Sequence, residues 1–245
     1  MQLFYAPGFV PPVHTLDEEE SRHCVRVLRL KEGDGLHLTD GRGNLYACRI
    51  VRADARGCRV EAVDVQRGFE PLPAALTLAV APTKNAERFE WMLEKVTEVG
   101  VSRIVPVESE HSERRIFKAA RGEKVITAAM KQSLKAWRPV LEPLTPFDEV
   151  LAAPFEGRRF IAHCAAARSA AGKSYLPAAL RPGEAALVLI GPEGDFSEAE
   201  IDRALACGFA EITLGSQRLR TETAGLAAAV MVSVVNGMQQ HSSME

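Results

Sequence analysis

The pattern of apolar residues along the chain changes near residue 70. Before that point, short apolar runs at 36–39, 45–51 and 58–65 are separated by turns, and one of these contains the hairpin dipeptide Asp40-Gly41. Such spacing is typical of a small β-barrel or sandwich. We therefore predict a β-rich domain over residues 1–70.

A short helix is expected within this β-rich domain. Thr15 and Glu18 resemble a capping box, in which a hydroxyl and a carboxylate three residues later satisfy the first amides of a helix. The helix is predicted over residues 16–24.

After a linker at 68–73 that contains Gly and Pro, strands and helices alternate. An apolar run at 75–81 precedes apolar residues at helical spacing, which begin after Asn85 as N-cap and end before Gly100. A second apolar run follows at 101–107. This βαβ pattern predicts an α/β domain over residues 74–245, with a parallel sheet and helices on its faces.

More elements of the same kind are expected further along the chain. The basic segment after residue 111 predicts a helix over 122–137 that Pro139 stops. Apolar runs at 160–163 and 185–190 have the length and composition of buried strands.

Two consecutive strand–loop–helix units occupy residues 185–237. The first loop, 191–195, is followed by Ser197 and Glu200, which form a capping box. The second loop begins after the run 211–214 and ends at Thr221, which is expected to cap a long Ala- and Val-rich helix. Ligands of open α/β sheets bind beyond the carboxyl ends of the strands, so both loops lie where a ligand is expected.

Composition and cysteine placement indicate a soluble, reduced, cytoplasmic protein. Of its 245 residues, 47% are hydrophobic and 25% are charged, as in ordinary globular proteins. The N-terminus lacks the features of a secretory signal, and the longest apolar stretch, 224–235, falls short of the ~20 residues of a membrane span. The five cysteines are scattered and never in CxxC spacing, which argues against a disulfide framework and a zinc site. No metal is expected.

Charge is distributed unevenly although the formal net charge is only −2. Residues 21–59 hold nine Lys and Arg against four acidic residues, and residues 111–138 hold eight against two. Two basic segments on a slightly acidic chain suggest fields directed at a polyanion such as RNA. Two solvated faces balanced elsewhere are an equally good interpretation from charge alone.

The glycine spacing in 191–195 argues against two common nucleotide sites. A Rossmann site needs GxGxxG after an early strand, and a P-loop needs GxxxxGK[ST], and neither is present here. Gly191 and Gly194 would allow backbone amides to approach a ligand closely. Tight turns in any α/β protein would use glycine in the same way.

The two loops together resemble those of a known family. The motif Gly191-Pro-Glu-Gly194, followed by Leu214-Gly and then Leu219-Arg-Thr-Glu-Thr-Ala224, resembles the RsmE family of ribosomal RNA uridine-N3 methyltransferases, within the SPOUT superfamily. Further matching segments are His23 to Arg29, Lys84, Lys95 to Val101 and Lys131-Gln-Ser133, so the likeness covers nearly the whole chain. The family usually has a second glycine where this chain has Asp195.

The resemblance implies a fold, a cofactor and partners. It implies a PUA-like β-barrel that holds RNA, then a SPOUT-like knotted α/β domain whose two loops clasp S-adenosylmethionine. It also implies a homodimer with the site at the subunit interface. The implied substrate is one uridine of small-subunit (16S) ribosomal RNA within the assembled 30S particle.

Site residues are assigned on this basis. Methyl transfer to uridine N3 spreads negative charge onto O2 and O4. We expect the Arg220 guanidinium to stabilise this charge. The alternative is that Arg220 forms a structural ion pair with Glu193 or Glu222. Glu193 is the other catalytic candidate, holding the loop or contacting substrate. Predicted cofactor contacts are Ile190, Gly191, Pro192, Gly194, Leu214, Gly215, Leu219, Thr221, Thr223 and Ala224. Predicted RNA contacts are His23, Arg26, Arg29, Lys84, Arg114, Arg115 and Lys118.

Several questions stay open from sequence. His111, His163 and Glu98 are general bases by type only, and His23 could instead be a buried core residue. Leu226, Val230 and Val234 suit a core or a dimer interface. Competing functions are a SPOUT ribose 2′-O-methyltransferase and an inactive RNA-binding assembly factor.

Overall fold

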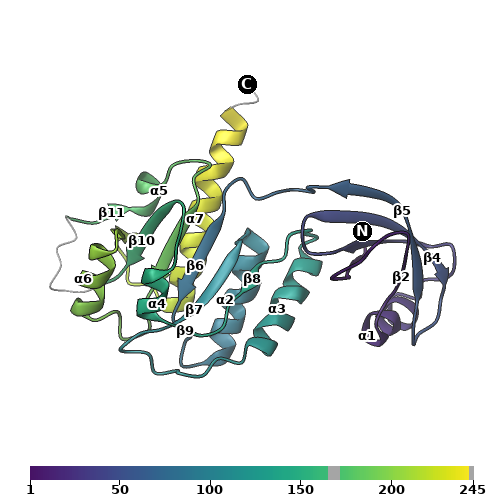
Figure 1. The fold of residues 1–245 in the computed structure, drawn as a ribbon, viewed down its shortest axis with the longest axis horizontal. Coiled ribbons are helices and arrows are strands. Elements are labelled where there is room, and N and C mark those ends of the chain that lie inside the picture. The colour runs from purple at the N-terminus through teal and green to yellow at the C-terminus, as the bar shows by residue number, and fades with distance from the viewer. Residues whose placement is uncertain (165–171, 243–245) are drawn as a thin grey trace. The chain divides into compact units, whose positions relative to one another are not determined.

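The computed structural model describes residues 1–164 and 172–242. The chain forms two compact units (Figure 1). The first consists of Met1–Pro71 together with Thr127–Arg138, and the second consists of Leu72–Ile126 and Pro139–Glu245.

The first unit is built on a five-stranded sheet. Its order is β1-β3-β4-β5-β2, in which β1 runs parallel to β3 and the other neighbours are antiparallel. Register shifts between β4 and β5 at Ala47/Cys48 and Ile50/Arg52 mark bulges, which bend and twist a sheet. The strands are β1 (Leu3–Tyr5), β2 (Val13–Thr15), β3 (Gly35–Thr39), β4 (Asn44–Arg52) and β5 (Arg59–Arg67).

The short helix of this unit starts later than the sequence predicts. Thr15 is the last residue of β2 and pairs with Arg59, so it is not free to cap a helix. Asp17 is the N-cap of α1 (Glu18–Arg22) and its carboxylate accepts from the Glu20 amide at 2.8 Å. The predicted capping box is therefore wrong, although a helix is present. It continues directly into a π-helix, η1 (His23–Val27).

A segment from the middle of the chain completes the first unit. The Trp137 indole donates to the Phe69 carbonyl at 2.8 Å, and the Arg138 amide donates to the Gly41 carbonyl at 2.9 Å. Gly43, with φ at +89°, lies so close to the Trp137 ring that a Cβ there would be only 2.2 Å from it. The predicted hairpin between β3 and β4 thus supports the Trp137 ring.

The second unit contains a parallel sheet of order β11-β13-β10-β12-β6-β7-β8, with β9 also paired to β7. Every pairing in it is parallel, as the βαβ pattern predicts. Its strands are β6 (Leu76–Val80), β7 (Arg103–Glu108), β8 (Val140–Leu141), β9 (Thr145–Pro146), β10 (Arg158–Ala162), β11 (Ser174–Tyr175), β12 (Ala186–Ile190) and β13 (Ala210–Thr213).

Helices cover both faces of this sheet (Figure 1). Successive side chains of a strand point to opposite faces, so Val188 and Ile190 join the core under α2 and α7, while Leu187 and Leu189 join the core under α4 and α6. The helices are α2 (Ala86–Val99), α3 (Ala119–Gln132), α4 (Phe147–Ala152), α5 (Leu176–Ala179), α6 (Glu198–Ala206) and α7 (Thr221–Ser242). The predicted α/β class is confirmed.

Local signals placed several helix ends correctly. The Asn85 side chain caps α2 by accepting from the Glu87 amide at 2.9 Å, and Gly100 ends it with φ at +114°. The capping box of Ser197 and Glu200 is present at the start of α6.

The end of α3 differs from the prediction. The helix stops at Gln132 rather than shortly before Pro139. Leu134 adopts a left-handed φ of 58°, and the Lys135 amide donates back to the Met130 carbonyl at 3.0 Å. These contacts form a helix-ending motif that usually uses glycine, so the sequence gives no sign of it.

The helix α7 is the one helix among the described residues that is long and apolar enough to cross a membrane by length and composition. Ala224, Ala228, Ala229 and Val232 lie in the core under α2. Packing in the second unit therefore explains the apolar residues on one side of α7, while Val230, Val234 and Met238 are exposed.

Candidate cofactor site and RNA-binding residues

Three neighbouring strands of the parallel sheet end at one cavity. β13, β10 and β12 lie side by side, and the loops that follow them enclose about 330 Å³. A volume of this size is at the small end of the range for ligand pockets. The cavity, called here the cofactor cavity, lies where ligands of open α/β sheets bind.

Most of the sequence-predicted cofactor residues border this cavity. The first loop (191–195) and the second loop (214–220) face it from β12 and β13. Predicted residues that line it are Ile190, Gly191, Pro192, Leu214, Gly215, Leu219, Thr221 and Ala224, together with Glu193 and Arg220.

Two predicted cofactor residues lie elsewhere. Gly194 is exposed and faces His111. A Cβ added to Gly194 would lie 3.1 Å from the Cβ of His111. Thr223 is exposed and borders a separate hollow with Arg88 and Trp91.

Packing explains the glycine that begins the first loop. A Cβ at Gly191 would lie 3.1 Å from the Phe196 ring, which is tighter than ordinary contact. The glycine therefore allows the loop to turn over Phe196, a buried residue of the core beneath it.

Asp195 ends the first loop in a conformation that favours glycine. Its φ is +64°, and Asp is one of the few side chains that adopt this region readily. Its carboxylate accepts from the Cys164 amide at 2.7 Å and from the Phe196 amide at 2.9 Å. The side chain that replaces the family's usual glycine thus joins the first loop to the chain after β10.

Further hydrogen bonds hold the first loop on other sides. The buried Thr221 hydroxyl donates to the Gly191 carbonyl at 3.0 Å, which joins the start of α7 to this loop. A Glu193 carboxylate oxygen accepts from the Lys84 amide at 3.0 Å. His111 Nδ1 contacts the Asp195 carbonyl at 3.0 Å.

The second loop has fewer contacts and carries exposed arginines. Gly215 has φ at +135°, and its amide donates to the Thr213 hydroxyl at 3.2 Å. Arg218 and Arg220 are exposed and line the cavity. Within the described part of the chain, Arg220 has no ion pair.

The ion pairs considered for Arg220 are not formed. Glu222 lies 3.9 Å from the Arg88 guanidinium, and Glu193 accepts from the Lys84 backbone. The Arg220 charge is therefore available to a bound molecule.

The sequence did not identify the third segment that borders the cavity. Ala162 is the last residue of β10, which lies between β12 and β13, and His163 and Cys164 follow it. The apolar run at 160–163 indicated this strand, but its position between the other two depends on sheet order. Ile212, Thr213 and Gln217 also line the cavity and were not predicted.

His163 is the centre of a buried network at the cavity. Its Nε2 lies 2.9 Å from a Glu211 carboxylate oxygen, and the Lys173 ammonium lies 3.2 Å from Nδ1. Because an ammonium can only donate, Nδ1 accepts, and Nε2 therefore carries the hydrogen. Burial is the largest effect on this group and lowers the pKa of His163.

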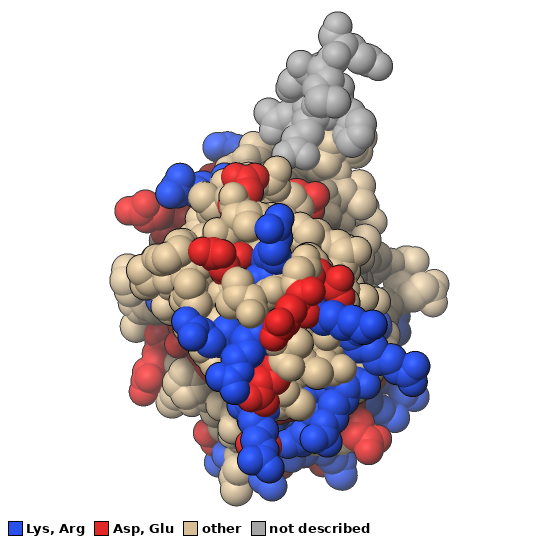
Figure 2. Space-filling view, turned by 90° about the vertical axis from the view of Figure 1, so that its right-hand side faces the viewer, with Lys and Arg blue, Asp and Glu red and all other residues tan. Residues whose placement is uncertain are grey.

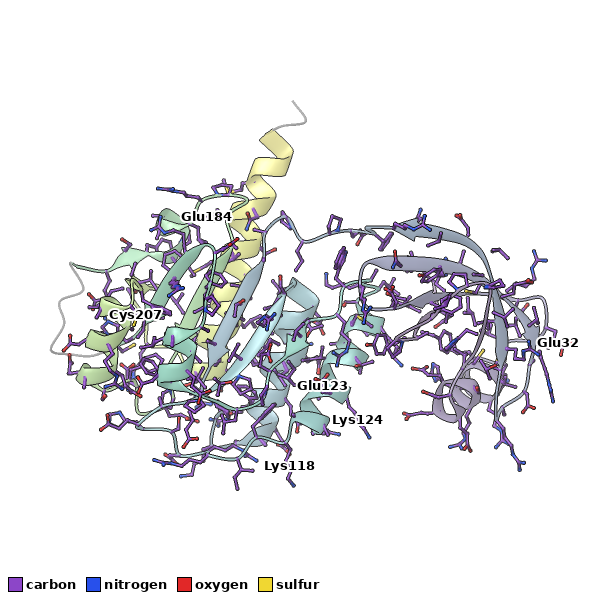
Figure 3. All side chains as sticks on the ribbon, in the orientation of Figure 1. Glu32, Lys118, Glu123, Lys124, Glu184 and Cys207 are labelled. Carbon is purple, nitrogen blue, oxygen red and sulfur yellow. The ribbon has the colours of Figure 1, made fainter. Side chains whose placement is uncertain are left out.

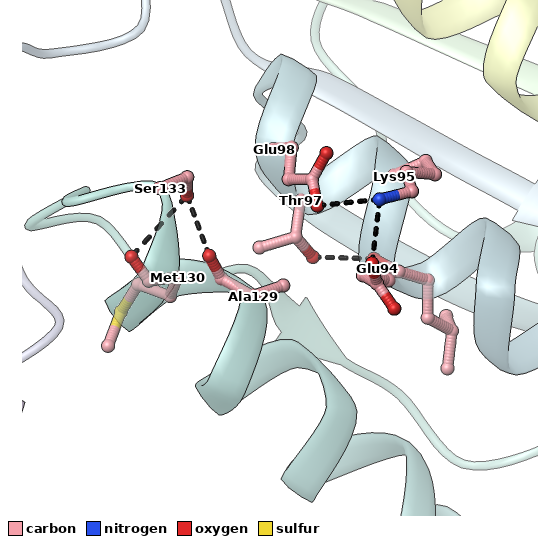
Figure 4. Close-up of polar contacts among 8 residues, drawn as sticks. Glu94, Lys95, Thr97, Glu98, Ala129, Met130 and Ser133 are labelled. Carbon is pink, nitrogen blue, oxygen red and sulfur yellow. Dashed lines mark hydrogen bonds and ion pairs between the residues drawn. The ribbon is translucent and has the colours of Figure 1, made fainter.

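None of the residues considered as a general base is clearly placed for that role. Both ring nitrogens of His163 already have partners. Glu98 pairs with Lys95, which also pairs with Glu94 (Figure 4). His111 Nδ1 contacts the Asp195 carbonyl, and His111 is not among the described residues that line the cavity.

The cavity combines apolar walls with side chains of both charges. Its walls include the apolar side chains of Ile190, Ile212 and Leu219, and its two acidic side chains, Glu193 and Asp195, are matched by Arg218 and Arg220. A nucleoside that carries both positive and negative groups fits this combination.

The predicted RNA contacts of the first unit are on its surface. His23 and Arg26 are exposed on η1, and Arg29 is exposed just after it with φ at +57°. His23 is therefore not a buried core residue, although its ring meets Phe4 edge-on at 6.1 Å. Figure 2 shows one face of the molecule, on which many Lys and Arg side chains gather, with acidic ones among them.

The predicted RNA contacts of the second unit differ in their pairing. The Lys84 ammonium lies 2.7 Å from Glu113, and their hydrogen bond raises the pKa of Lys84. Arg115 lies 3.6 Å from Glu108. Arg114 donates to two backbone carbonyls, and Lys118 is exposed ahead of α3 (Figure 3).

Other segments that carry the resemblance have structural contacts. Lys131 forms an ion pair with Glu20 within the first unit. The Ser133 hydroxyl donates to the Ala129 carbonyl at 2.7 Å, beyond the last turn of α3 (Figure 4).

Two family models match the chain. Residues 70–233 match an RNA methyltransferase domain, and residues 16–63 match an RNA methyltransferase PUA domain. The predicted SPOUT-like parallel-sheet domain preceded by a PUA-like unit is confirmed.

Known proteins of the same kind are similar over most of their length. Ribosomal RNA small subunit methyltransferase E of Synechocystis sp. is 31% identical over 90% of this chain and 73% of that protein. A probable rRNA-methyltransferase from Porphyromonas gingivalis is 44% identical, with a TM-score of 0.90 over 98% of this chain and 100% of that one. Ribosomal RNA small subunit methyltransferase E from Neisseria gonorrhoeae, bound to S-adenosyl methionine, is 27% identical, with a TM-score of 0.80 over 98% and 97% of the two chains. This chain belongs to the RNA methyltransferase family that includes ribosomal RNA small subunit methyltransferase E.

Proposed function

We propose that this protein methylates N3 of one uridine in small-subunit (16S) ribosomal RNA, with S-adenosylmethionine as the methyl donor. The observation that carries the proposal is the Arg220 guanidinium, which borders the cofactor cavity and has no ion pair in the described part of the chain. In this proposal residues 1–70 hold RNA and residues 74–245 carry out the transfer.

The cofactor cavity fits S-adenosylmethionine in chemistry. Leu214 and Leu219, both half-buried, offer apolar surface to adenine, and the backbone of 214–220 offers polar groups to its edge. Glu193 and Asp195 supply negative charge beside a cationic sulfonium. When bound, S-adenosylmethionine supplies an electrophilic methyl group.

Arg220 acts on the substrate in this mechanism. Loss of the N3 proton to solvent water leaves negative charge on O2 and O4 of uridine, and a guanidinium can donate to both kinds of oxygen. A positioned cation that meets charge as it develops contributes about 3–4 kcal/mol to catalysis. Glu193 holds the first loop by accepting from the Lys84 amide and thus acts as a positioning residue.

RNA is proposed to contact both units. His23, Arg26 and Arg29 supply exposed donors on and just after η1. Arg114 and Lys118 supply charge in the second unit, which carries the cofactor cavity, and Lys84 and Arg115 can exchange their surface carboxylates for phosphates. Exposed ion pairs are worth little, so this exchange is not costly.

The proposed assembly is a cytoplasmic homodimer that acts on the assembled 30S particle. Val230, Val234 and Met238 are 41%, 53% and 67% exposed and recur at every fourth residue of α7. Such spacing places them on one face of the helix, where a second copy of the chain would cover an apolar stripe.

The decisive experiment compares ribosomal RNA from cells with and without this protein. Nucleoside mass spectrometry is expected to find 3-methyluridine in small-subunit RNA only when the protein is present. A ribose-methylated nucleoside in its place would support the 2′-O-methyltransferase alternative. Calorimetry with S-adenosylmethionine tests the inactive-factor alternative, because a protein that does not bind the cofactor cannot carry out the transfer.

A further inference from the structure

Another cavity in the second unit combines aromatic and basic side chains. It encloses about 380 Å³ between the start of α2 and the segment that leads into α3. Phe89 and Phe117 contribute rings, and Arg114, Lys118 and Arg121 contribute positive charge. We call it the basic cavity.

The aromatic part of the basic cavity is firmly held. Phe89 is buried in the main core, and Phe117 is half-buried against it, with the two ring centroids 5.5 Å apart in an edge-to-face arrangement. Packing against Phe89 fixes the Phe117 ring, which therefore offers a preformed surface on which a planar group can stack.

The charged part of the basic cavity is only partly neutralised. Glu90 is the one acidic side chain among the described residues that line it, and it pairs with Arg121 at 3.0 Å. Arg114 Nε donates to the Ile116 carbonyl at 3.1 Å, and its Nη1 donates to the Lys84 carbonyl at 3.2 Å. Those carbonyls orient the guanidinium without cancelling its charge. Within the described residues, Lys118 has no ion pair.

One loop connects the basic cavity to the cofactor cavity. Pro82 lines the basic cavity, and the Lys84 carbonyl accepts from Arg114. The Lys84 amide in turn donates to Glu193, which lines the cofactor cavity. The chain between β6 and α2 therefore contacts both sites.

We propose that the basic cavity binds one unstacked nucleotide of the substrate RNA, other than the uridine that is methylated. Its base stacks on Phe117, and its phosphate lies between Arg114 and Lys118. The combination of an aromatic surface with uncompensated cations matches a nucleotide, whereas an acidic peptide would need only the charge. The inference rests on the proposed function, because it takes RNA as the substrate.

Removing one charge tests the phosphate contact. The substrate is small-subunit particles from cells that lack this protein. Lys118→Ala is expected to raise the KM for these particles about fivefold to tenfold and to leave kcat unchanged. The slope of the logarithm of the binding constant against the logarithm of salt concentration should fall in magnitude by about 1. Lys124→Ala is the matched control, because Lys124 is an exposed lysine of α3 outside the cavity (Figure 3). Equal effects of the two variants would overturn the assignment and indicate general attraction.

Removing the ring tests the stacking contact. Phe117→Leu keeps an apolar side chain in the core and is expected to raise the KM for RNA about tenfold, since a stacked base contributes about 1–3 kcal/mol. An unchanged melting temperature and an unchanged affinity for S-adenosylmethionine show that the fold and the cofactor cavity are intact.

Photocrosslinking identifies the contact directly. A short oligouridylate carrying 5-iodouridine is expected to crosslink to the peptide that contains Phe117, and Lys118→Ala should weaken the crosslink. RNA crosslinked only to other peptides, at saturating binding, would overturn the proposal for this cavity while leaving the methyl transfer in place. If the protein neither binds S-adenosylmethionine nor methylates any RNA, the proposed function itself has failed.

Discussion

The two loops of the cofactor cavity are held in different ways. The first loop (191–195) is joined to three other parts of the second unit, through the Asp195 carboxylate, the Thr221 hydroxyl and the Glu193 carboxylate. Among the described residues, the hydrogen bonds of the second loop (214–220) are local, such as the bond from the Gly215 amide to Thr213, and its tertiary contacts come from Leu214 and Leu219 against the core. Its arginines are exposed.

This difference separates binding from catalysis within one site. A loop fixed by bonds to distant segments is preorganised, so it loses little freedom when the cofactor binds. A loop with few tertiary contacts can adjust its cationic side chains to the substrate. We therefore expect changes in the first loop to weaken cofactor binding and changes in the second to slow the transfer.

The largest expected effect is on turnover in the second loop. Arg220→Ala should lower kcat about 100- to 1000-fold, which is the usual cost of removing one donor to developing charge. Calorimetry should find an affinity for S-adenosylmethionine within a factor of about two of the parent protein, since the side chain acts on uridine in this mechanism.

Arg218→Ala is the matched control for Arg220→Ala. Arg218 is an exposed arginine in the same loop and borders the same cavity. If both variants lose the same small factor, the loop supplies only general charge. Near-normal turnover of Arg220→Ala with intact cofactor binding would remove Arg220 from the mechanism.

The next effect is on cofactor affinity in the first loop. Asp195→Ala should weaken the Kd for S-adenosylmethionine about tenfold, because hydrogen bonds to a charged group contribute about 1.5–3 kcal/mol and two amides lose their acceptor. Turnover at saturating cofactor should change much less.

Asp195→Gly separates the carboxylate from the backbone. Glycine adopts the φ of +64° without strain, so any loss of affinity in this variant comes from the missing bonds to the amides of Cys164 and Phe196. A glycine variant that binds the cofactor as tightly as the parent would show that the carboxylate is dispensable.

A smaller effect is expected where the start of α7 meets the first loop. Thr221→Val preserves shape but removes the hydroxyl that donates to the Gly191 carbonyl. Chemical denaturation should show about 1 kcal/mol less free energy of unfolding, the usual net value of such a bond. Thr213→Val, which removes a half-buried hydroxyl at the end of β13 that donates to the Gly215 carbonyl of the second loop, should cost less. The opposite order would contradict the contrast between the loops.

Sequence was a good guide where a rule is local. The capping box of Ser197 and Glu200, the N-cap Asn85 and the ending at Gly100 are each set by a few neighbouring residues. Parallel strands end at the same edge of a sheet, which is why the two loops were expected to meet and do border one cavity.

Sequence was a poor guide where a contact depends on topology. His163 and Cys164 border the cavity because β10 lies between β12 and β13, an order that residue patterns do not encode. The packing of Trp137 against Gly43 joins residues far apart in the chain. Asp195 is an intermediate case, because an acidic residue at a family glycine was visible, but its acceptor role needed the position of Cys164.

The smallest expected effect is a pH dependence centred on His163. Its folded pKa lies below the ordinary histidine value of 6.5, mainly through burial, with Lys173 lowering it further and Glu211 and Asp195 opposing. The unfolded chain therefore binds more protons once the pH falls below about 6.5, and acid favours unfolding from that point downward. Its contribution to stability is complete above pH 6.5 and is lost as the pH falls toward the folded pKa. The melting temperatures of the parent and of His163→Gln should therefore converge as the pH falls. His14 and His37 also have lowered pKa values, but both proteins contain them, so they do not affect the difference. A constant difference between the two proteins across this range would show that His163 does not titrate on unfolding.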